Sequence, residues 1–316
     1  MQKKLLSLVL MLIVSINTFA YADFTVDGIR YRISSNEEGT CAVIGHEELT
    51  NSTLIIPTSV TNGNDIKYAV ESIGYEAFAD CSGLTSITIP SSINRIRYGA
   101  FDKCENLNTA IIEQGETDII LENRYFYSIK KLITNRNIKT LRSYSNNNTK
   151  DSPFGEKLNI IEFGKRFTRI DDYLFYGCSG LTSVNIPSSV TTIKKNAFDN
   201  CENLNTAIIE QGGTDITLED RCFYSIKKLI ANRNIKTLRP YSNNNTKDSP
   251  FGEKLNIIEF GERFTRIDDY LFYGCSGLTS VNIPENVTSI GRGAFWGCIY
   301  NHRTTKTNQK YPSVNL

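Results

Sequence analysis

Cysteine is the chemically reactive residue with the most regular spacing in this chain. Six of the eight cysteines form neighbouring pairs 23 residues apart, namely Cys81 with Cys104, Cys178 with Cys201 and Cys275 with Cys298. Such a pair can form a disulfide in an oxidising compartment, or remain as two small buried thiols. Cys41 and Cys222 have no evident partner. The spacing is not a zinc pattern, so we expect no metal site and no cofactor.

Histidine is scarce, and the sequence contains only His46 and His302. Because histidine titrates most readily near neutral pH, this scarcity disfavours acid–base catalysis. We find no Gly-rich phosphate loop, no Gly-x-Ser-x-Gly turn and no plausible Cys–His pairing. The acidic pairs at 171–172 and 268–269 lack the ligand spacing of a calcium loop and predict the start of a helix or turn. We therefore expect no catalytic residues and no enzymatic activity.

Positive charge gathers in two equivalent segments. The first contains Arg124, Lys130, Lys131, Arg136, Lys139 and Arg142, and the second contains Arg221, Lys227, Lys228, Arg233, Lys236 and Arg239. As exposed bands, they would suit a repeating anionic polymer such as a sulfated glycan. Alternatively, they form a solvated face that Asp151, Glu156 and Glu162 of adjacent turns neutralise. The net charge of +1 gives no argument for nucleic acid or membrane as a partner.

The elements that position these residues are internal repeats. Residues 104–186 recur at 201–283, a shift of 97 residues, with seven differences such as Tyr125 against Cys222. Inside this unit lies the shorter pattern Phe-x-x-Cys-x-x-Leu-x-x-Ile/Val-x-Ile-Pro. Counted from its Leu, turns begin at residues 84, 107, 132, 158, 181, 204, 229, 255 and 278, after a degenerate first turn near residue 51. The period is therefore 23 to 26 residues.

A period of this length with a Leu-x-x-Leu-x-Leu core predicts a leucine-rich repeat, in which each turn is one short strand and a return segment. In the strand of residues 181–186, Leu181, Val184 and Ile186 should point inward, while Ser183 and Asn185 point outward. Stacked turns would bury a continuous core, and ten turns would span roughly 48 Å. The expected fold is an α/β repeat solenoid, a curved rod with a parallel sheet on one face.

The segment LTSVNIPSSVTTIKKNAFDNCENL resembles the 23-residue repeat of the BspA-like, or Treponema-type, leucine-rich-repeat family. The resemblance covers about residues 51–298. That family is common in surface and secreted proteins of gut and oral bacteria, and it uses the repeated Cys as a small buried residue, which favours free thiols here. The turns that begin at 132 and 229 lack the Pro step, so their strands are expected to be short or irregular.

The two ends of the chain differ from the repeats. Lys3 and Lys4, the apolar run 5–16 and Ala20-Tyr21-Ala22 predict a signal peptide over 1–22. The run is too short for a membrane span, and no second one follows. Residues 23–50 resemble the β-hairpin cap that often opens such proteins. The polar tail 299–316 has no repeat pattern, so an irregular cover, a partner or truncation would account for the open last turn.

The outward positions of the predicted sheet should form one exposed face. They are Ser86, Thr88, Thr109, Ile111, Glu113, Ile160, Glu162, Ser183, Asn185, Ile208, Glu210, Ile257, Glu259, Ser280 and Asn282. Repeat proteins usually bind partners on this face, and isoleucine is unusual on a surface that only meets water. We therefore expect a secreted or cell-surface protein that mediates protein binding or adhesion to host matrix, receptors or other microbes. The alternative is an envelope-associated accessory protein that binds host surface glycans.

Overall fold

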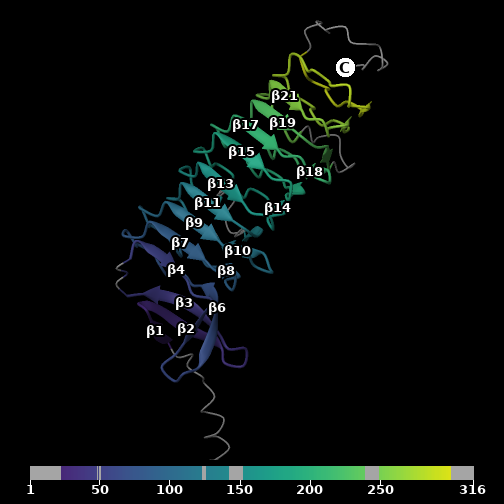
Figure 1. Cartoon of the computed structure of the whole chain (residues 1–316). Coiled ribbons are helices and arrows are strands. Elements are labelled where there is room, and N and C mark those ends of the chain that lie inside the picture. Colours follow the sequence, from purple (N-terminus) through teal and green to yellow (C-terminus); the bar gives the residue numbers. More distant parts are fainter. Residues whose placement is uncertain are drawn as a thin grey trace, which may run out of the picture.

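The computed structural model describes residues 23–47, 49, 51–122, 126–141, 152–238 and 249–299. The predicted signal peptide, residues 300–316 of the tail, Arg124, Arg142, Asp151 and Arg239 lie outside this part. Within it, the chain forms an elongated stack of turns that rises from the N-terminal strands towards the C-terminal end (Figure 1). The expected repeat solenoid is confirmed.

One parallel sheet surface takes a strand from nearly every turn. Its strands are β4 (Thr53–Ile55), β7 (Ser86–Ile89), β9 (Thr109–Ile112), β11 (Lys131–Thr134), β13 (Ile160–Phe163), β15 (Ser183–Ile186), β17 (Thr206–Ile209), β19 (Lys228–Ala231) and β21 (Ile257–Phe260). Alternation along each strand buries one set of side chains, such as Ile87 and Ile89, and leaves Ser86 and Thr88 half-buried on the outer side. The strands of the turns at 132 and 229 are complete, contrary to expectation, because Leu132 and Leu229 are fully buried and hold them in register.

The return segments form a second run of short parallel strands. These are β8 (Arg95–Ile96), β10 (Ile119–Glu122), β12 (Ile138–Leu141), β14 (Arg169–Ile170), β16 (Thr192–Ile193), β18 (Ile216–Leu218), β20 (Ile235–Thr237), β22 (Arg266–Ile267) and β23 (Ser289–Ile290). The described residues contain no α-helix, so the helical part of the expected α/β class is absent. Asp80, Lys103 and Asn200 adopt left-handed backbone angles directly before a repeat cysteine, and such a residue ends a right-handed helical turn.

The N-terminal cap is the predicted β-hairpin followed by a third strand. Strands β1 (Asp23–Val26), β2 (Ile29–Ser35) and β3 (Thr40–His46) pair antiparallel, and β3 then pairs in parallel with β6 (Lys67–Ile73). Strand β5 (Ser59–Thr61) pairs antiparallel with the other side of β6. The cap therefore extends the second sheet, and no strand of the described residues pairs with the first sheet on its β4 side.

A ladder of buried phenylalanines runs the length of the core. Consecutive rings of Phe78, Phe101, Phe126, Phe154, Phe175, Phe198, Phe223, Phe251, Phe272 and Phe295 are stacked with centroids 5.1–6.3 Å apart. Each stacked pair adds about 0.5–1.5 kcal/mol beyond the area that it buries. Because the ladder does not depend on strand pairing, it joins turns whose strands are not paired.

The sheets are interrupted once in every 97-residue copy. In the turn that begins at Leu158, β13 pairs back with β11 while β14 pairs forward with β16. The turn that begins at Leu255 repeats this arrangement, since β21 pairs back with β19 and β22 pairs forward with β23. Each copy of the duplicated sequence therefore has the same offset: at this turn a stretch of the first sheet ends while a new stretch of the second sheet begins.

Candidate functional site

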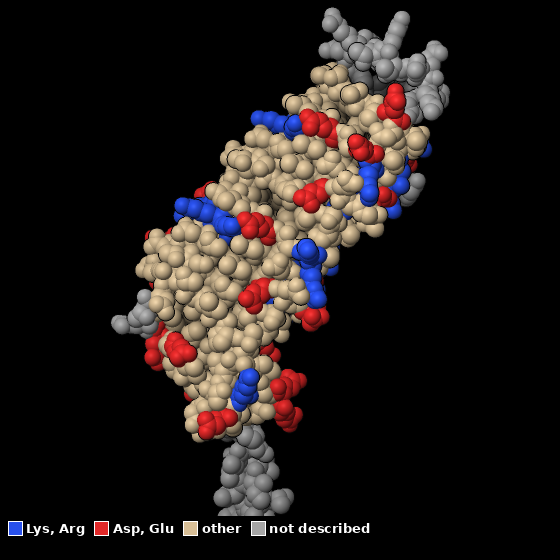
Figure 2. Space-filling model, in the orientation of Figure 1, with Lys and Arg blue, Asp and Glu red and all other residues tan. Residues whose placement is uncertain are grey.

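The outward side chains of the first sheet form continuous rows across separate turns. Register pairs Thr88 with Ile111 and Ile111 with Ile133, and the next copy places Asn185, Ile208 and Ile230 in the same way. Figure 2 shows this side of the rod as largely uncharged, with separated charged groups of both signs. A partner that spans several turns would therefore meet a surface of repeating chemistry.

Isoleucine is the most prominent apolar residue on this face. Ile55 is 67% exposed, and Ile160 and Ile257, which are equivalent in the two copies, are both 48% exposed. Ile111 and Ile208 are half-buried in the neighbouring rows. Apolar side chains that recur at equivalent places in the two copies give the face a binding character that scattered single residues would not have.

Ion pairs and hydrogen bonds fix the polar part of the face. Lys131 Nζ lies 2.6 Å from Glu162 Oε1, and Lys228 Nζ lies 2.6 Å from Glu259 Oε1. Asn185 donates its side-chain amide to Glu210. Glu113 is exposed just after β9. Each lysine is thus neutralised by a glutamate of the next turn. The exposed Ile160 and Ile257 lie two residues before these glutamates.

The last two predicted face residues lie outside any strand. Ser280 and Asn282 are exposed, but residues 279–286 form no strand. The equivalent strand β15 pairs only forward, with β17, because of the offset between copies. Residues 280–283 have no following strand to pair with in the described part, so the first sheet ends at β21.

The basic segments do not form two exposed bands. Lys130 and Lys227 are exposed in the turns before β11 and β19, and Lys139 is exposed on β12. Lys131 and Lys228 lie on the first sheet, and Lys236 lies on β20 of the second sheet, 3.3 Å from Asp215. Arg221 pairs with Asp199 and stacks over the ring of Tyr224 at 3.7 Å. Residues that are close in sequence are thus distributed around the turn.

Arg136 and Arg233 are buried and belong to the core, which corrects their assignment to a basic surface. Both side chains are 2% exposed. The guanidinium of Arg136 donates to the carbonyl oxygens of Pro90, Ser91 and Ile93 at 2.7–3.1 Å, two turns back. Arg233 makes the equivalent three bonds in the second copy. Burial lowers the pKa of Arg136 to about 10.

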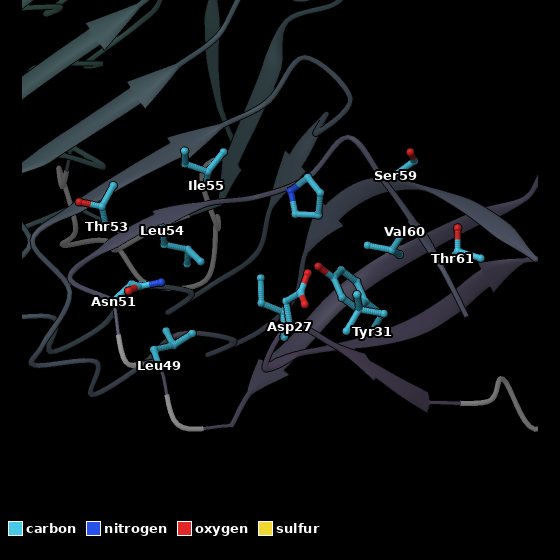
Figure 3. A pocket seen from close by; sticks show the side chains of 13 residues that line it. Asp27, Tyr31, Leu49, Asn51, Thr53, Leu54, Ile55, Ser59, Val60 and Thr61 are labelled. Atoms are coloured by element: carbon cyan, nitrogen blue, oxygen red, sulfur yellow. The ribbon is translucent and has the colours of Figure 1, made fainter. Parts of the chain in front are cut away.

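A pocket of about 630 Å³ lies where the cap meets the first turn (Figure 3). Val26, Asp27 and Tyr31 of the cap line it together with Leu54 of β4 and Val60 of β5. Burial is the main cause of a raised pKa for the Tyr31 hydroxyl, with smaller effects from Cys41 and Asp27. The lining combines apolar side chains with the carboxylate of Asp27 and the phenol of Tyr31, and no sequence pattern predicted the pocket.

The free edge of β4 borders this pocket. The Ser52 carbonyl accepts from the Thr85 amide at 2.7 Å, and the Ile56 amide donates to Thr88 at 3.2 Å. Backbone groups of alternate residues point to opposite sides of a strand, so those of Thr53 and Ile55 point away from β7. Within the described residues no strand pairs with that side. An edge of this kind can take an extended peptide as an added strand.

All eight cysteines are free thiols, and seven of them are buried. Cys104, Cys201 and Cys298 each donate to the carbonyl of the phenylalanine one turn back. One expectation was wrong, since a Cys–His pair exists: the sulfur of Cys81 lies 3.1 Å from Nε2 of His46. The two residues are 35 positions apart, and only the packing of the cap on the first repeat brings them together.

The acidic pairs serve as ion-pair partners. Asp171 lies 2.6 Å from Arg169 and 2.9 Å from Lys194, and Asp268 lies 3.2 Å from Arg266. Among the described residues, no three His, Cys, Asp or Glu side chains are grouped as metal ligands would be. The same part of the chain holds no helix long and apolar enough to cross a membrane.

The chain is similar to known leucine-rich-repeat proteins. The sequence matches the family described as BspA type leucine rich repeat region over residues 58–154, 152–251 and 249–313. No curated protein matches it. Among solved structures, a leucine rich cell surface protein from Faecalibacterium prausnitzii is 20% identical, with 88% of this chain and 86% of that chain covered and a TM-score of 0.35.

Two further solved structures are similar to the same degree. A leucine-rich repeat protein from Bacteroides ovatus is 21% identical over 88% of this chain and 93% of that chain, with a TM-score of 0.36. The leucine rich repeat protein of T. pallidum is 18% identical over 88% and 90% of the respective chains, with a TM-score of 0.37. The family match spans well over half of the sequence, and the chain belongs to the BspA type leucine rich repeat family.

Proposed function

We propose that this chain is an exported surface protein that binds a protein partner through the outward face of its first sheet. The observation that carries the proposal is an exposed isoleucine at the same place in each copy: Ile160 lies in register with Lys131, and Ile257 lies in register with Lys228 four turns further on. Four turns correspond to roughly 20 Å, a distance that a protein interface of ordinary size covers. The signal-peptide pattern at 1–22 supports export.

The proposal assigns a binding role and no catalysis. The alternative, a glycan-binding accessory protein, would depend on Lys130, Lys139 and Lys227 among the described residues, because Arg136 and Arg233 are buried and Lys131, Lys228 and Lys236 are paired. Three exposed lysines on separate turns give a weaker electrostatic attraction than the two six-residue bands that the sequence indicated. The apolar rows therefore favour a protein partner over an anionic glycan.

The experiment compares binding of the purified exported chain to an array of purified extracellular matrix proteins and to a sulfated glycan array. The test variant is Ile160→Glu with Ile257→Glu. Its matched control is Ile66→Glu, because Ile66 is 49% exposed in the turn between β5 and β6, away from the sheet face. Loss of a central apolar contact costs about 2 kcal/mol, so the affinity for a protein ligand should fall by roughly 30-fold or more.

The outcomes separate the two functions. Binding to a matrix protein that Ile66→Glu retains and the double variant loses supports the sheet face. Binding to sulfated glycans alone, abolished by Lys130→Glu with Lys227→Glu, would replace the proposal with the alternative. Hydrolysis of an array component that survives repurification would show that the chain is an enzyme.

A further inference from the structure

Three cysteine pairs occupy equivalent places in the repeat but differ in their surroundings. The sulfur of Cys178 lies 3.9 Å from the Ser152 hydroxyl, and Cys275 is hydrogen bonded to the hydroxyl of Ser249. In the first pair, a histidine occupies that role, because Cys81 contacts His46 of the cap. The repeat therefore supplies two internal controls for the single pair that has an imidazole.

The hydrogen bonds of His46 determine which nitrogen carries its proton. Nδ1 lies 2.5 Å from the backbone oxygen of Glu47, and a carbonyl oxygen can only accept, so Nδ1 is the donor. Nε2 then presents a lone pair to the thiol of Cys81 at 3.1 Å. The ring is held in this direction by stacking on Phe78, with the planes 10° apart and the centroids 5.8 Å apart. The imidazole is therefore oriented as a base for the thiol.

Cys104 approaches the same sulfur from the next turn. Its thiol donates to the Phe78 carbonyl, and its side chain is the largest influence that lowers the pKa of Cys81 below the ordinary 9.0, against burial and the charge of Asp80. Lys103, 3.7 Å from Asp80, partly neutralises that charge. By contrast, burial raises the pKa of Cys178 to about 12. Burial likewise raises the pKa of Cys201, Cys275 and Cys298 in the other two pairs.

We propose that Cys81 is a thiol–disulfide exchange site, activated by His46 and resolved by Cys104, whose substrate is a small disulfide. His46 takes the proton of Cys81, and the thiolate attacks one sulfur of the substrate, breaking its S–S bond and releasing one thiolate that takes the proton from His46. The regenerated base accepts the proton of Cys104, whose thiolate attacks the Cys81 sulfur and expels the second half of the substrate as a thiolate, which takes that proton. Two protein thiols are oxidised to one disulfide, and the substrate disulfide is reduced to two thiols.

Access and geometry are compatible with this sequence of steps. Cys81 is 8% exposed and His46 is half-buried, whereas Cys178, Cys201 and Cys275 have no exposed surface. Cys298 is half-buried, but its partner Cys275 is enclosed. Equivalent residues of adjacent paired turns lie about 5 Å apart, which is within the range that a disulfide spans. The product would link the first two regular turns, directly beside the cap.

The test uses the purified exported chain with glutathione disulfide, acid quenching, alkylation and peptide mapping. Arg95, Arg97 and Lys103 lie between the two cysteines, so trypsin separates their peptides unless a disulfide joins them. The Cys81–Cys104 disulfide should form about ten times faster, or more, than a disulfide in either of the other pairs. Cys104→Ala should accumulate a mixed disulfide of glutathione with Cys81.

The base is tested with His46→Gln, which keeps a planar polar side chain, and thermal unfolding confirms that the variant is folded. The exchange rate of Cys81 should fall by roughly ten-fold or more. If His46→Gln does not fold, the three pairs of the unmodified chain still decide the question by their relative rates. Equal rates at the three pairs, or an unchanged rate in folded His46→Gln, would overturn the proposal.

Discussion

Arg233 passes so closely over Gly212 that a Cβ atom on this glycine would lie 2.6 Å from Nη1 of the arginine. The first copy repeats the relationship, with 2.5 Å between a Cβ on Gly115 and Nη1 of Arg136. The guanidinium cannot simply swing aside, because three carbonyl oxygens hold it in a buried place. The glycine and the arginine are therefore one structural unit.

Gly212→Ala should destabilise the protein by about 1–3 kcal/mol, since the added methyl group overpacks a buried site. Gly213→Ala is the matched control, because a Cβ on the adjacent glycine would meet nothing within 4 Å. Its effect should stay below about 1 kcal/mol. The measurement is urea unfolding followed by circular dichroism. Equal effects of the two substitutions would show that Gly212 and Arg233 do not pack as one unit.

The reactivity of Cys81 should depend on pH differently from that of Cys178. The thiolate is the nucleophile, so a lowered pKa means that alkylation of Cys81 by iodoacetamide reaches half of its maximum below pH 9.0. Cys178, with a pKa raised to about 12, should remain mostly unmodified at pH 8. The charged and titratable groups that face Cys81 are His46, Cys104 and Asp80, the last paired with Lys103.

Cys104→Ala removes the side chain that lowers the pKa of Cys81 and should move the midpoint of Cys81 alkylation to higher pH. Mass spectrometry of the alkylated peptides measures each site separately. A midpoint that stays in place would show that Cys104 does not stabilise the thiolate.

Amide hydrogen exchange should reveal the open edge of β4. The Leu54 and Ile56 amides face β7 and should be protected, whereas those of Thr53 and Ile55 face the pocket and should exchange quickly. In β7, which has a strand on each side, Ile87 and Thr88 should both be protected. Protection of Thr53 and Ile55 in the free protein would mean that the edge is already occupied.

Deletion of residues 104–200 should leave a folded, shorter rod. The deletion joins Lys103 to Cys201, the counterpart of Cys104, and each remaining turn keeps a neighbour of nearly the same sequence. The rod should shorten by roughly 20 Å in small-angle scattering. Its urea m-value should fall by roughly a third, because less surface is exposed on unfolding. Loss of cooperative unfolding would show that the two copies are not interchangeable.

The sequence alone determined the repeating part of the fold. Leu181, Val184 and Ile186 are buried, and the phenylalanines and cysteines of the Phe-x-x-Cys-x-x-Leu pattern lie in the core, as the period indicated. The parallel sheet and the N-terminal hairpin are also present. These features follow from local patterns that recur in every copy. Side chains alternate between the two faces of each strand, and each turn must bury its apolar side chains against the next turn.

Only the tertiary structure decided which residues leave that pattern. A sequence shows that Arg136 is charged, but its three carbonyl partners come from a turn more than 40 residues earlier. His46 and Cys81 meet because the cap packs on the first repeat, and the free edge of β4 exists because the cap joins the other sheet. Such contacts depend on how separate elements pack in space, and the periodicity of the sequence carries no record of them.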